Sequence, residues 1–410
     1  MKTKVFSSLI ALVFFVVSTI SCSGKKDLVV DPNKQGETPE NIDTTKSPIE
    51  DSLFDYSLSL KKLEIIKPEL EFKTIALGRE SSFNKRDGKK VQIEKFGICH
   101  PSIVFSDVEF NGYKYWAAMT PRFGVLDKEI DIDAFENPHI FCSKNGLDWE
   151  EPLGLKNPID TTIKGPYNCY WSDPSLLLTS NKLYLYYRGC GYPYNFFGDK
   201  KMHLRNVVNR SSDDGINWSS RNFLYGTNSS FISGIDDFSV IASQSFIEDN
   251  GKFVCYEVAY SSEKNPYLPY GNQTKAFVFR REDENPNGSF GNFNSSKICS
   301  FENRPWGENN DPWHLEVVKF GGKYFMLLNV GLVGKSNGDS LWLAYSSDGK
   351  KFSVIDEALF LRDTYKSSMV PVYQDNKVLK FRVYQSKKKD GSINAYSLEL
   401  KKNIIVSSTK

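Results

Sequence analysis

Three stretches of the chain follow one pattern: SKNGLDW at 143–149, SDDGINW at 212–218 and SSDGKKF at 346–352. Each reads Ser-x-Asp/Asn-Gly-x-x-aromatic, and the copies are spaced by about one and two times 70 residues. Asn-Gly and Asp-Gly favour tight hairpin turns, and the aromatic three residues after the glycine can pack back over the turn. The pattern predicts a repeat of about seventy residues, with a degenerate copy expected at 280–291.

A second motif runs in step with the first and marks one apolar strand in each repeat. Its copies begin HPSIV at 100, DPSLL at 173, SQSFI at 243, HLEVV at 314 and KSSMV at 366. A turn with Asn or Gly and an aromatic-rich strand follow each copy. The order then continues through a loop, a third strand, the first motif as a turn, and a fourth strand. That order describes a four-stranded propeller blade, so the expected fold is all-β, a five-bladed β-propeller. A two-sheet sandwich with accidental turn similarity is the alternative, and five copies in phase argue against it.

The N-terminal segments set the limits of the predicted propeller. Residues 1–22 place two lysines before an apolar run, which is typical of an export signal. Residues 23–65 are polar and poor in large apolar side chains, which predicts a disordered tether. The propeller is expected over 66–410. Its last repeat is short of one strand, and LEFKTIAL at 70–77 is predicted to supply it.

The end of the signal carries a further prediction. Thr19-Ile20-Ser21-Cys22 resembles the lipobox of bacterial lipoproteins, in which the cysteine becomes the lipidated first residue. The resemblance implies lipidation at Cys22 and an exported protein anchored to a membrane of the cell envelope, at the outer membrane or the cell surface. The alternative is an ordinary cleaved signal and a secreted protein. The other cysteines match no zinc motif, and they suit either disulfides or buried thiols.

The composition excludes one class of partner and favours another. Lys and Arg number 52 against 50 Asp and Glu, so the net charge is only +2, and no basic stripe follows the chain. Nucleic acid is therefore not an expected partner. Aromatic residues make up 14% of the chain, which suits β-strands and a site that stacks on the flat face of a ligand.

The repeat places equivalent side chains around the central channel. The first strand of each blade lines the channel, and side chains on one face of a strand recur every second residue. The upper ring is predicted to contain His100, Asp173, Ser243, His314 and Lys366. The ring below it is predicted to contain Ser102, Ser175, Ser245, Glu316 and Ser368. Glu316 is the one carboxylate in a ring of hydroxyls, and we interpret it as a functional acid.

Long aromatic loops are expected at the same mouth of the channel, over 121–137, 189–202 and 261–273. Aromatic rings around a polar channel suit a carbohydrate, because a sugar offers C–H faces for stacking and hydroxyls for hydrogen bonds. The expected partner is therefore a carbohydrate substrate. The side chains predicted to bind it are Arg188, Glu257, Trp171, Tyr192, Asn329 and Lys366.

Together these motifs resemble the five-bladed glycoside hydrolases, of which family 43 arabinofuranosidases and xylosidases and family 32 are the best known. The resemblance covers about residues 70–410 and implies hydrolysis of glycosidic bonds by carboxylates at the mouths of the first three blades. Asp173 matches the position of the helper that tunes a pKa in that family. His100 stands at the position of the base, and no Glu accompanies Ser243 at the position of the acid.

The expected activity is hydrolysis of a glycosidic bond in a polysaccharide or oligosaccharide, which requires an acid and a base or nucleophile across that bond. Asp173 is predicted as base or pKa tuner, Glu316 as acid, and His100 and His314 as assisting groups. No cofactor and no metal is predicted. Structural roles compete, since Asp173 could cap a strand and Glu316 could bridge to a Lys or Arg.

Two other functions stay open at this point. A glycan-binding surface lipoprotein without catalysis fits the departures from the family pattern. A lyase or a sialidase-like enzyme fits the turn motif, although sialidases have six blades and three clustered arginines. Arg188 is the one arginine placed well for such a cluster.

Overall fold

The computed structural model describes the following residues: 54–66, 82–84, 90–125, 136–160, 168–192, 204–226, 238–261, 276–291, 295–332, 338–375 and 377–404. The predicted signal peptide, Cys22 and most of the predicted tether lie outside them. Export and lipidation therefore stay predictions. Within the described residues, no helix combines the length and the apolar character needed to cross a membrane.

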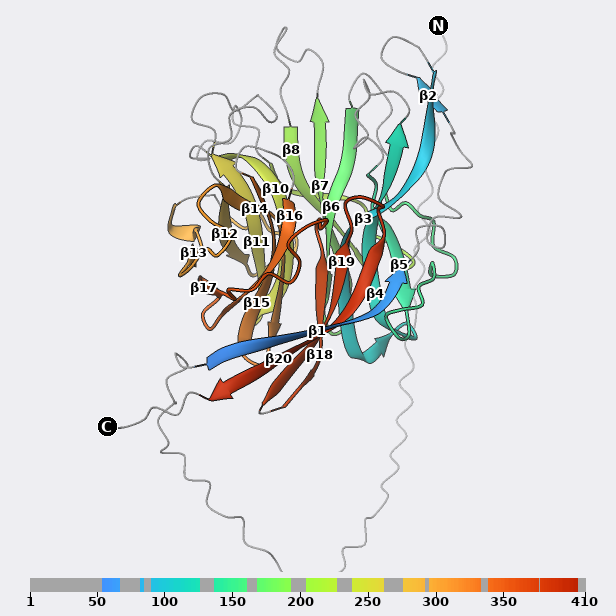
Figure 1. Cartoon of the computed structure of the whole chain (residues 1–410). Coiled ribbons are helices and arrows are strands. Elements are labelled where there is room, and N and C mark those ends of the chain that lie inside the picture. Colours follow the sequence, from blue (N-terminus) through green and yellow to red (C-terminus); the bar gives the residue numbers. More distant parts are fainter. Residues whose placement is uncertain are drawn as a thin grey trace, which may run out of the picture. The chain divides into compact units, whose positions relative to one another are not determined.

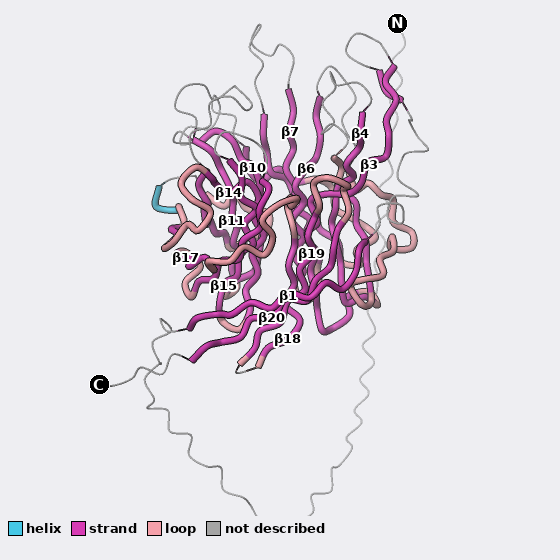
Figure 2. Tube along the Cα trace, in the orientation of Figure 1, coloured by secondary structure: helices cyan, strands magenta, loops and turns pink. Residues whose placement is uncertain are grey.

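Nearly all described elements are strands, and they form five sheets (Figures 1 and 2). The predicted five-bladed β-propeller is confirmed. Blade one contains β2 (Ser82–Asn84), β3 (Lys90–Phe110), β4 (Tyr113–Val125) and β5 (His139–Ser143). Blade two contains β6 (Asn168–Leu178), β7 (Leu183–Tyr192), β8 (Leu204–Ser212) and β9 (Asn222–Gly226). In the first four blades the repeated apolar motif lies within a long strand, namely β3, β6, β10 (Phe238–Asp249) or β14 (Asn310–Phe320), and in blade five it begins two residues before β18 (Ser368–Gln374).

The third and fourth blades depart from four strands in opposite ways. Blade three has β10 (Phe238–Asp249), β11 (Lys252–Ser261) and β12 (Ala276–Asp283). A short 3-10 helix, η3 (Ser295–Lys297), precedes a single bridge from Ile298 to Phe279 in β12. Blade four has β14 (Asn310–Phe320), β15 (Lys323–Leu332), β16 (Gly338–Ser346) and β17 (Lys351–Val354), with β13 (Ser300–Phe301) parallel to β17.

Blade five closes the ring with a strand from the other end of the chain. It contains β18 (Ser368–Gln374), β19 (Val378–Ser386), β20 (Ile393–Ile404) and β1 (Phe54–Ile66). Strand β1 pairs antiparallel with β20, and the two lie side by side in Figure 1. The expectation that an N-terminal segment completes this blade is correct. The segment is wrong, because 54–66 closes the blade and 70–77 lies outside the described residues. The predicted tether therefore ends earlier than residue 65.

The hydrophobic core lies between neighbouring blades. Trp116 of blade one packs with Leu185 of blade two, and both are fully buried. Phe325 of blade four packs with Phe381 of blade five, with ring centroids 5.0 Å apart. Burying one such side chain stabilises the fold by about 1.5–3 kcal/mol, so the apolar strand faces hold the blades together.

The turn motif also joins each blade to its neighbour. Tyr384 donates a hydrogen bond from its hydroxyl to the carbonyl of Gly146 (2.9 Å), and Tyr256 donates in the same way to Gly349 (2.8 Å). Tyr186 donates to the carbonyl of Pro286 (3.1 Å), in the copy expected to be degenerate. The aromatic-rich second strand of one blade is thus tied to the turn of the next blade.

The predicted lower ring of serines proves to be a set of bonds between first strands. Each hydroxyl accepts a hydrogen bond from a backbone N–H of the following blade. The pairs are Ser102 with Leu176 (2.9 Å), Ser175 with Phe246 (3.0 Å), Ser245 with Val317 (3.0 Å) and Ser368 with Ile103 (2.9 Å). This role explains why a small hydroxyl recurs at the position.

Replacing Ser175 by Ala is expected to lower the free energy of unfolding by about 1–3 kcal/mol, because the buried N–H of Phe246 loses its acceptor. Guanidinium unfolding measures the change. Ser220→Ala is the matched control, since Ser220 is exposed and its hydroxyl makes no hydrogen bond that the structure records. Equal losses in the two variants would show that the hydroxyl does not join the blades.

Candidate functional site

Two of the upper-ring side chains are aimed by a local kink in their strands. His100 and Asp173 adopt left-handed backbone conformations, with φ of 53° and 51°. The pairing register shifts at the same points, between Cys99 and Ser102 in β3 and between Ser172 and Ser175 in β6. Bulges of this kind bend a strand and redirect a side chain. In both strands the bulge precedes the serine that joins the blades.

His100, Asp173 and His314 meet at one point, and we call them the trio. The Nε2 atom of His314 lies 3.0 Å from Oδ1 of Asp173, and Nε2 of His100 lies 3.8 Å from the same oxygen. No member is more than 1% exposed. Three side chains predicted from separate blades therefore form one cluster around a single carboxylate oxygen.

Asp173 is held as a carboxylate by its other oxygen. Oδ2 accepts hydrogen bonds from the Arg188 guanidinium and from the Ser172 hydroxyl. Burial alone would raise the pKa of Asp173, but the charge of Arg188 and the two imidazoles hold that pKa well below its usual range. Arg188, predicted to bind substrate, thus fixes the trio's carboxylate.

His100 presents an unprotonated ring nitrogen to Asp173. The Thr120 hydroxyl donates to the carbonyl of Cys99 (3.4 Å), so it accepts from Nδ1–H of His100 (2.8 Å). Burial lowers the pKa of His100 well below its usual value, although Asp173 opposes that shift. A neutral imidazole with its proton on Nδ1 has a lone pair on Nε2. That lone pair faces the carboxylate.

His314 is oriented in the same sense by Asn329. The amide nitrogen of Asn329 donates to the carbonyls of Ser340 (3.2 Å) and Thr364 (3.3 Å), which turns its Oδ1 toward Nδ1 of His314 (3.4 Å). Burial also lowers the pKa of His314. Its Nε2 lies 3.0 Å from the same Asp173 oxygen, and the hydrogen bond between them favours the carboxylate form of Asp173. Asn329, predicted to contact substrate, positions an imidazole.

The trio therefore gathers two ring nitrogens and one carboxylate oxygen at one point, a set that is suited to a cation in place of the proton between His314 and Asp173. Nε2 of His100 has no hydrogen-bond partner among the described residues, and Oδ1 of Asp173 is within hydrogen-bond distance of Nε2 of His314. The three candidate ligand atoms lie within 4.8 Å of one another. A metal ion lies about 2 Å from an imidazole nitrogen or a carboxylate oxygen. It can therefore bind both atoms of a pair that are 3.0 or 3.8 Å apart, which are the distances from Oδ1 of Asp173 to the two Nε2 atoms. Two imidazoles and one carboxylate with fixed outer hydrogen bonds are a common metal ligand set.

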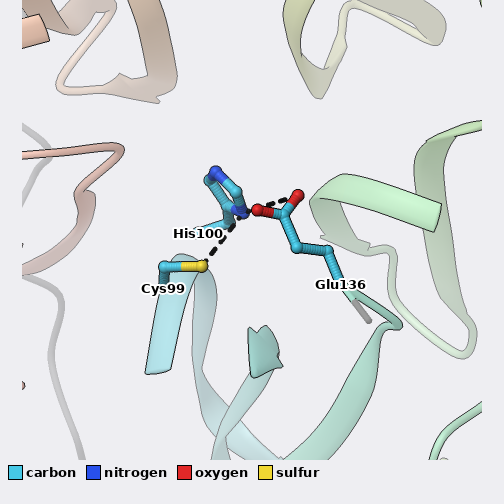
Figure 3. A group of neighbouring side chains, drawn as sticks. All are labelled: Cys99, His100 and Glu136. Atoms are coloured by element: carbon cyan, nitrogen blue, oxygen red, sulfur yellow. Dashed lines mark hydrogen bonds and ion pairs between the residues drawn. The ribbon is translucent and has the colours of Figure 1, made fainter. Parts of the chain in front are cut away.

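A second group flanks the other edge of His100, as Figure 3 shows. The Sγ of Cys99 lies 3.4 Å from Nδ1 of His100, and Oε2 of Glu136 lies 3.8 Å from the same atom. Because Nδ1 carries the proton donated to Thr120, this edge is less suited to a cation than the trio. Glu136, three residues before β5, does bring a carboxylate to the site.

Glu316 lies in the ring below and does not join the trio. Its Oε1 accepts hydrogen bonds from Ser368 (2.9 Å) and Ser102 (3.3 Å). Burial raises the pKa of Glu316 to about 7, and the Lys366 ammonium opposes that shift. Lys366 itself is fully buried and donates to the carbonyl of Pro174. The predicted acid thus shares hydroxyls with the blade junctions, and Lys366 holds the residue after Asp173.

Trp171 and Glu257 have contacts with other residues, and the side chain of Tyr192 lies outside the description. Trp171 is buried, and the Arg221 guanidinium lies 4.3 Å from its ring centroid. Tyr192 ends β7, and its side chain is not among those described. Glu257 is fully buried and is bound by Arg281 and by the Tyr225 hydroxyl (2.6 Å). These contacts assign Glu257 a structural role.

The sequence left open whether the cysteines form disulfides or buried thiols, and Cys99, Cys142, Cys255 and Cys299 are buried thiols. Two residues of the site escaped the sequence analysis. Thr120 orients His100, and Tyr365 packs on both imidazoles, with ring centroids 4.5 Å from His314 and 5.1 Å from His100. A single sequence carries no signal that relates these positions to the upper ring.

No family model matches the chain, so the resemblance to families 43 and 32 stays a prediction. A curated relative from Flavonifractor plautii, an A type blood N-acetyl-alpha-D-galactosamine deacetylase, is 41% identical over 63 residues. That match covers 15% of this chain and 7% of the relative.

Solved structures are similar over most of the chain. An N-acetylgalactosamine deacetylase from F. plautii, in complex with blood group B trisaccharide, has a TM-score of 0.57 at 16% identity, covering 84% of this chain and 95% of that one. Zg3597, a family 117 glycoside hydrolase of the marine bacterium Zobellia galactanivorans, has a TM-score of 0.47 at 14% identity, covering 84% and 90%. The first of these likenesses supports the fold. Each of these similar proteins is carbohydrate-active by name.

Proposed function

We propose that this chain is a glycan-processing hydrolase whose reaction centre is the trio, and that it removes the acetyl group from an N-acetylated amino sugar. The observation that carries the proposal is the convergence of two neutral imidazole nitrogens on one Asp173 oxygen. The 63-residue similarity to a deacetylase adds support for the substrate class. The predicted pair of Asp173 and Glu316 is a weaker basis, because the two carboxylates lie in different rings.

The chain's own residues would divide the work as follows. His100, His314 and Asp173 would hold a divalent cation, and Thr120 and Asn329 would keep both imidazoles in the required tautomer. Such a cation polarises a carbonyl and lowers the pKa of water. Arg188 keeps Asp173 ionised and oriented. Burial of the trio excludes bulk water and strengthens each electrostatic contact within it.

We expect the purified protein to contain a divalent cation and to lose both thermal stability and turnover after dialysis against a chelator. Binding to the folded state alone stabilises it, so adding Zn²⁺ or Mn²⁺ back should restore the melting temperature. Elemental analysis measures the content. His314→Gln should abolish binding, whereas His139→Gln, outside the trio, should retain it. A protein that neither contains nor responds to any divalent cation would contradict the proposal.

Glycosidic hydrolysis is the second candidate function. It is favoured by Glu316, whose Oε2 is buried without a hydrogen-bond partner among the described residues and whose raised pKa suits a proton donor. Incubation with glycans that carry N-acetylgalactosamine or N-acetylglucosamine separates the two reactions. Deacetylation releases acetate, glycosidic hydrolysis releases a reducing sugar, and binding without either product supports a glycan-binding protein.

We also propose that the protein acts in the cell envelope, anchored through Cys22. Support for this comes from the N-terminal sequence alone. A lipid anchor would place the channel mouth within reach of extracellular or periplasmic glycans.

A further inference from the structure

Three consecutive residues at the start of blade five each touch a different part of the trio's support. Thr364 accepts a hydrogen bond at its carbonyl from Asn329, which orients His314. Lys366 donates to the carbonyl of Pro174, next to Asp173. Tyr365, between them, lies against both imidazole rings. This short segment therefore faces the reaction centre along its whole length.

The backbone holds Tyr365 rigidly in this place. The N–H of Tyr365 donates to the carbonyl of Ser386 (2.9 Å) in β19. The preceding Thr364 donates from its hydroxyl to the carbonyl of Asp339 (3.1 Å). Asp363 enters the segment with a left-handed φ of 58°. The ring itself packs against the hydrophobic core and both imidazoles, and a ring held in this way loses little further conformational entropy when a ligand packs on it.

The ring of Tyr365 is placed to meet a ligand as well as the imidazoles. The plane of the phenol ring makes an angle of 70° with the His314 ring, in an edge-on contact, and an angle of 43° with the His100 ring. Tyr365 is partly exposed, whereas Arg188, Glu136 and every member of the trio are buried. Of these side chains, Tyr365 is therefore the one that offers surface to a ligand.

We propose that Tyr365 is the substrate-stacking residue of this site and contributes to its specificity for a pyranose ring. The apolar C–H face of the sugar lies on the phenol, and a ring substituent is directed at the trio. The inference rests on the proposed function for the identity of that substituent. It differs from the sequence-based expectation that the stacking residues lie in the long loops.

Tyr365→Leu keeps apolar volume but removes the flat face, and Tyr365→Phe keeps the face. On an N-acetylgalactosamine-terminated trisaccharide, we expect Tyr365→Leu to raise KM about tenfold or more with kcat little changed. Tyr365→Phe should stay near wild type. Saturation-transfer NMR with the same trisaccharide reports binding without turnover. Tyr373→Leu is the matched control, because Tyr373 is half exposed at the far end of β18.

The outcomes separate the inference from the proposed function. A Tyr365→Leu variant with wild-type KM, or with lowered kcat at unchanged KM, overturns the inference and leaves the function standing. Binding that Tyr365→Leu abolishes, without turnover by the wild type, supports the inference and overturns the function. If the wild type neither binds nor converts the trisaccharide or its N-acetylglucosamine counterpart, both are wrong. Melting temperatures of all variants show whether each one is folded.

Discussion

Replacing Asp173 by Asn is expected to lower turnover of the glycan substrate by about three orders of magnitude or more. The amide nitrogen cannot lie at the Oδ2 position, because the Arg188 guanidinium and the Ser172 hydroxyl both donate there. The nitrogen must therefore take the Oδ1 position, where its N–H groups meet the Nε2 atoms of His100 and His314. The variant fills the point where the ligand atoms of the trio converge, and it also removes the counter-charge of the buried Arg188, so its melting temperature should fall.

The measurement is kcat/KM together with metal content and melting temperature. Asp375→Asn is the matched control, because Asp375 accepts backbone hydrogen bonds within its own exposed turn and an Asn can do the same. We expect the control to match the wild type in all three quantities. Wild-type turnover by the Asp173→Asn variant would mean that the trio is not the reaction centre.

Replacing Glu257 by Ala is expected to lower the free energy of unfolding by about 3–5 kcal/mol without a direct effect on the trio. Glu257 and Arg281 are at most 1% exposed, and they form an ion pair within blade three. Arg281 also donates to the carbonyl of Gly291 and lies over the ring of Tyr225. Removal of the carboxylate leaves a buried guanidinium without its counter-charge.

Guanidinium unfolding of two further variants tests that explanation. Glu282→Ala removes an exposed partner of Arg280 from the same strand, and its cost should stay below about 1 kcal/mol. A double variant, Glu257→Leu with Arg281→Met, should recover stability because no unpaired charge remains. A double variant as unstable as Glu257→Ala would mean that the loss came from packing.

The repeat made much of the fold predictable, because side-chain alternation and Asp-Gly turns are local. The closing strand was harder to predict. Phe54, Tyr56, Leu58 and Leu60 alternate as a strand should, but they follow a polar segment, and the apolar run at 70–77 offers a competing candidate. The choice between the two depends on pairing with β20, more than three hundred residues away.

The candidate site was predictable in its members and less so in their roles. Phase in the repeat placed His100, Asp173 and His314 at equivalent positions, and the structure brings them together. The tautomers depend on Thr120 and Asn329, whose hydrogen bonds follow from strand pairing and from the path of a neighbouring loop. The meaning of the serine ring also depends on backbone groups of the next blade. The sequence also does not show that the Ser102 and Ser368 hydroxyls donate to Glu316, so Glu316 looked like a free acid.

The most direct test of the proposed reaction is the mass of the glycan after incubation with the purified protein. An oligosaccharide terminated by N-acetylgalactosamine should lose one acetyl group and keep all of its sugars, and the Asp173→Asn variant should leave it unchanged. A product that is shorter by one sugar, or an N-acetylated glycan panel that stays intact while it binds, would contradict deacetylation at the trio.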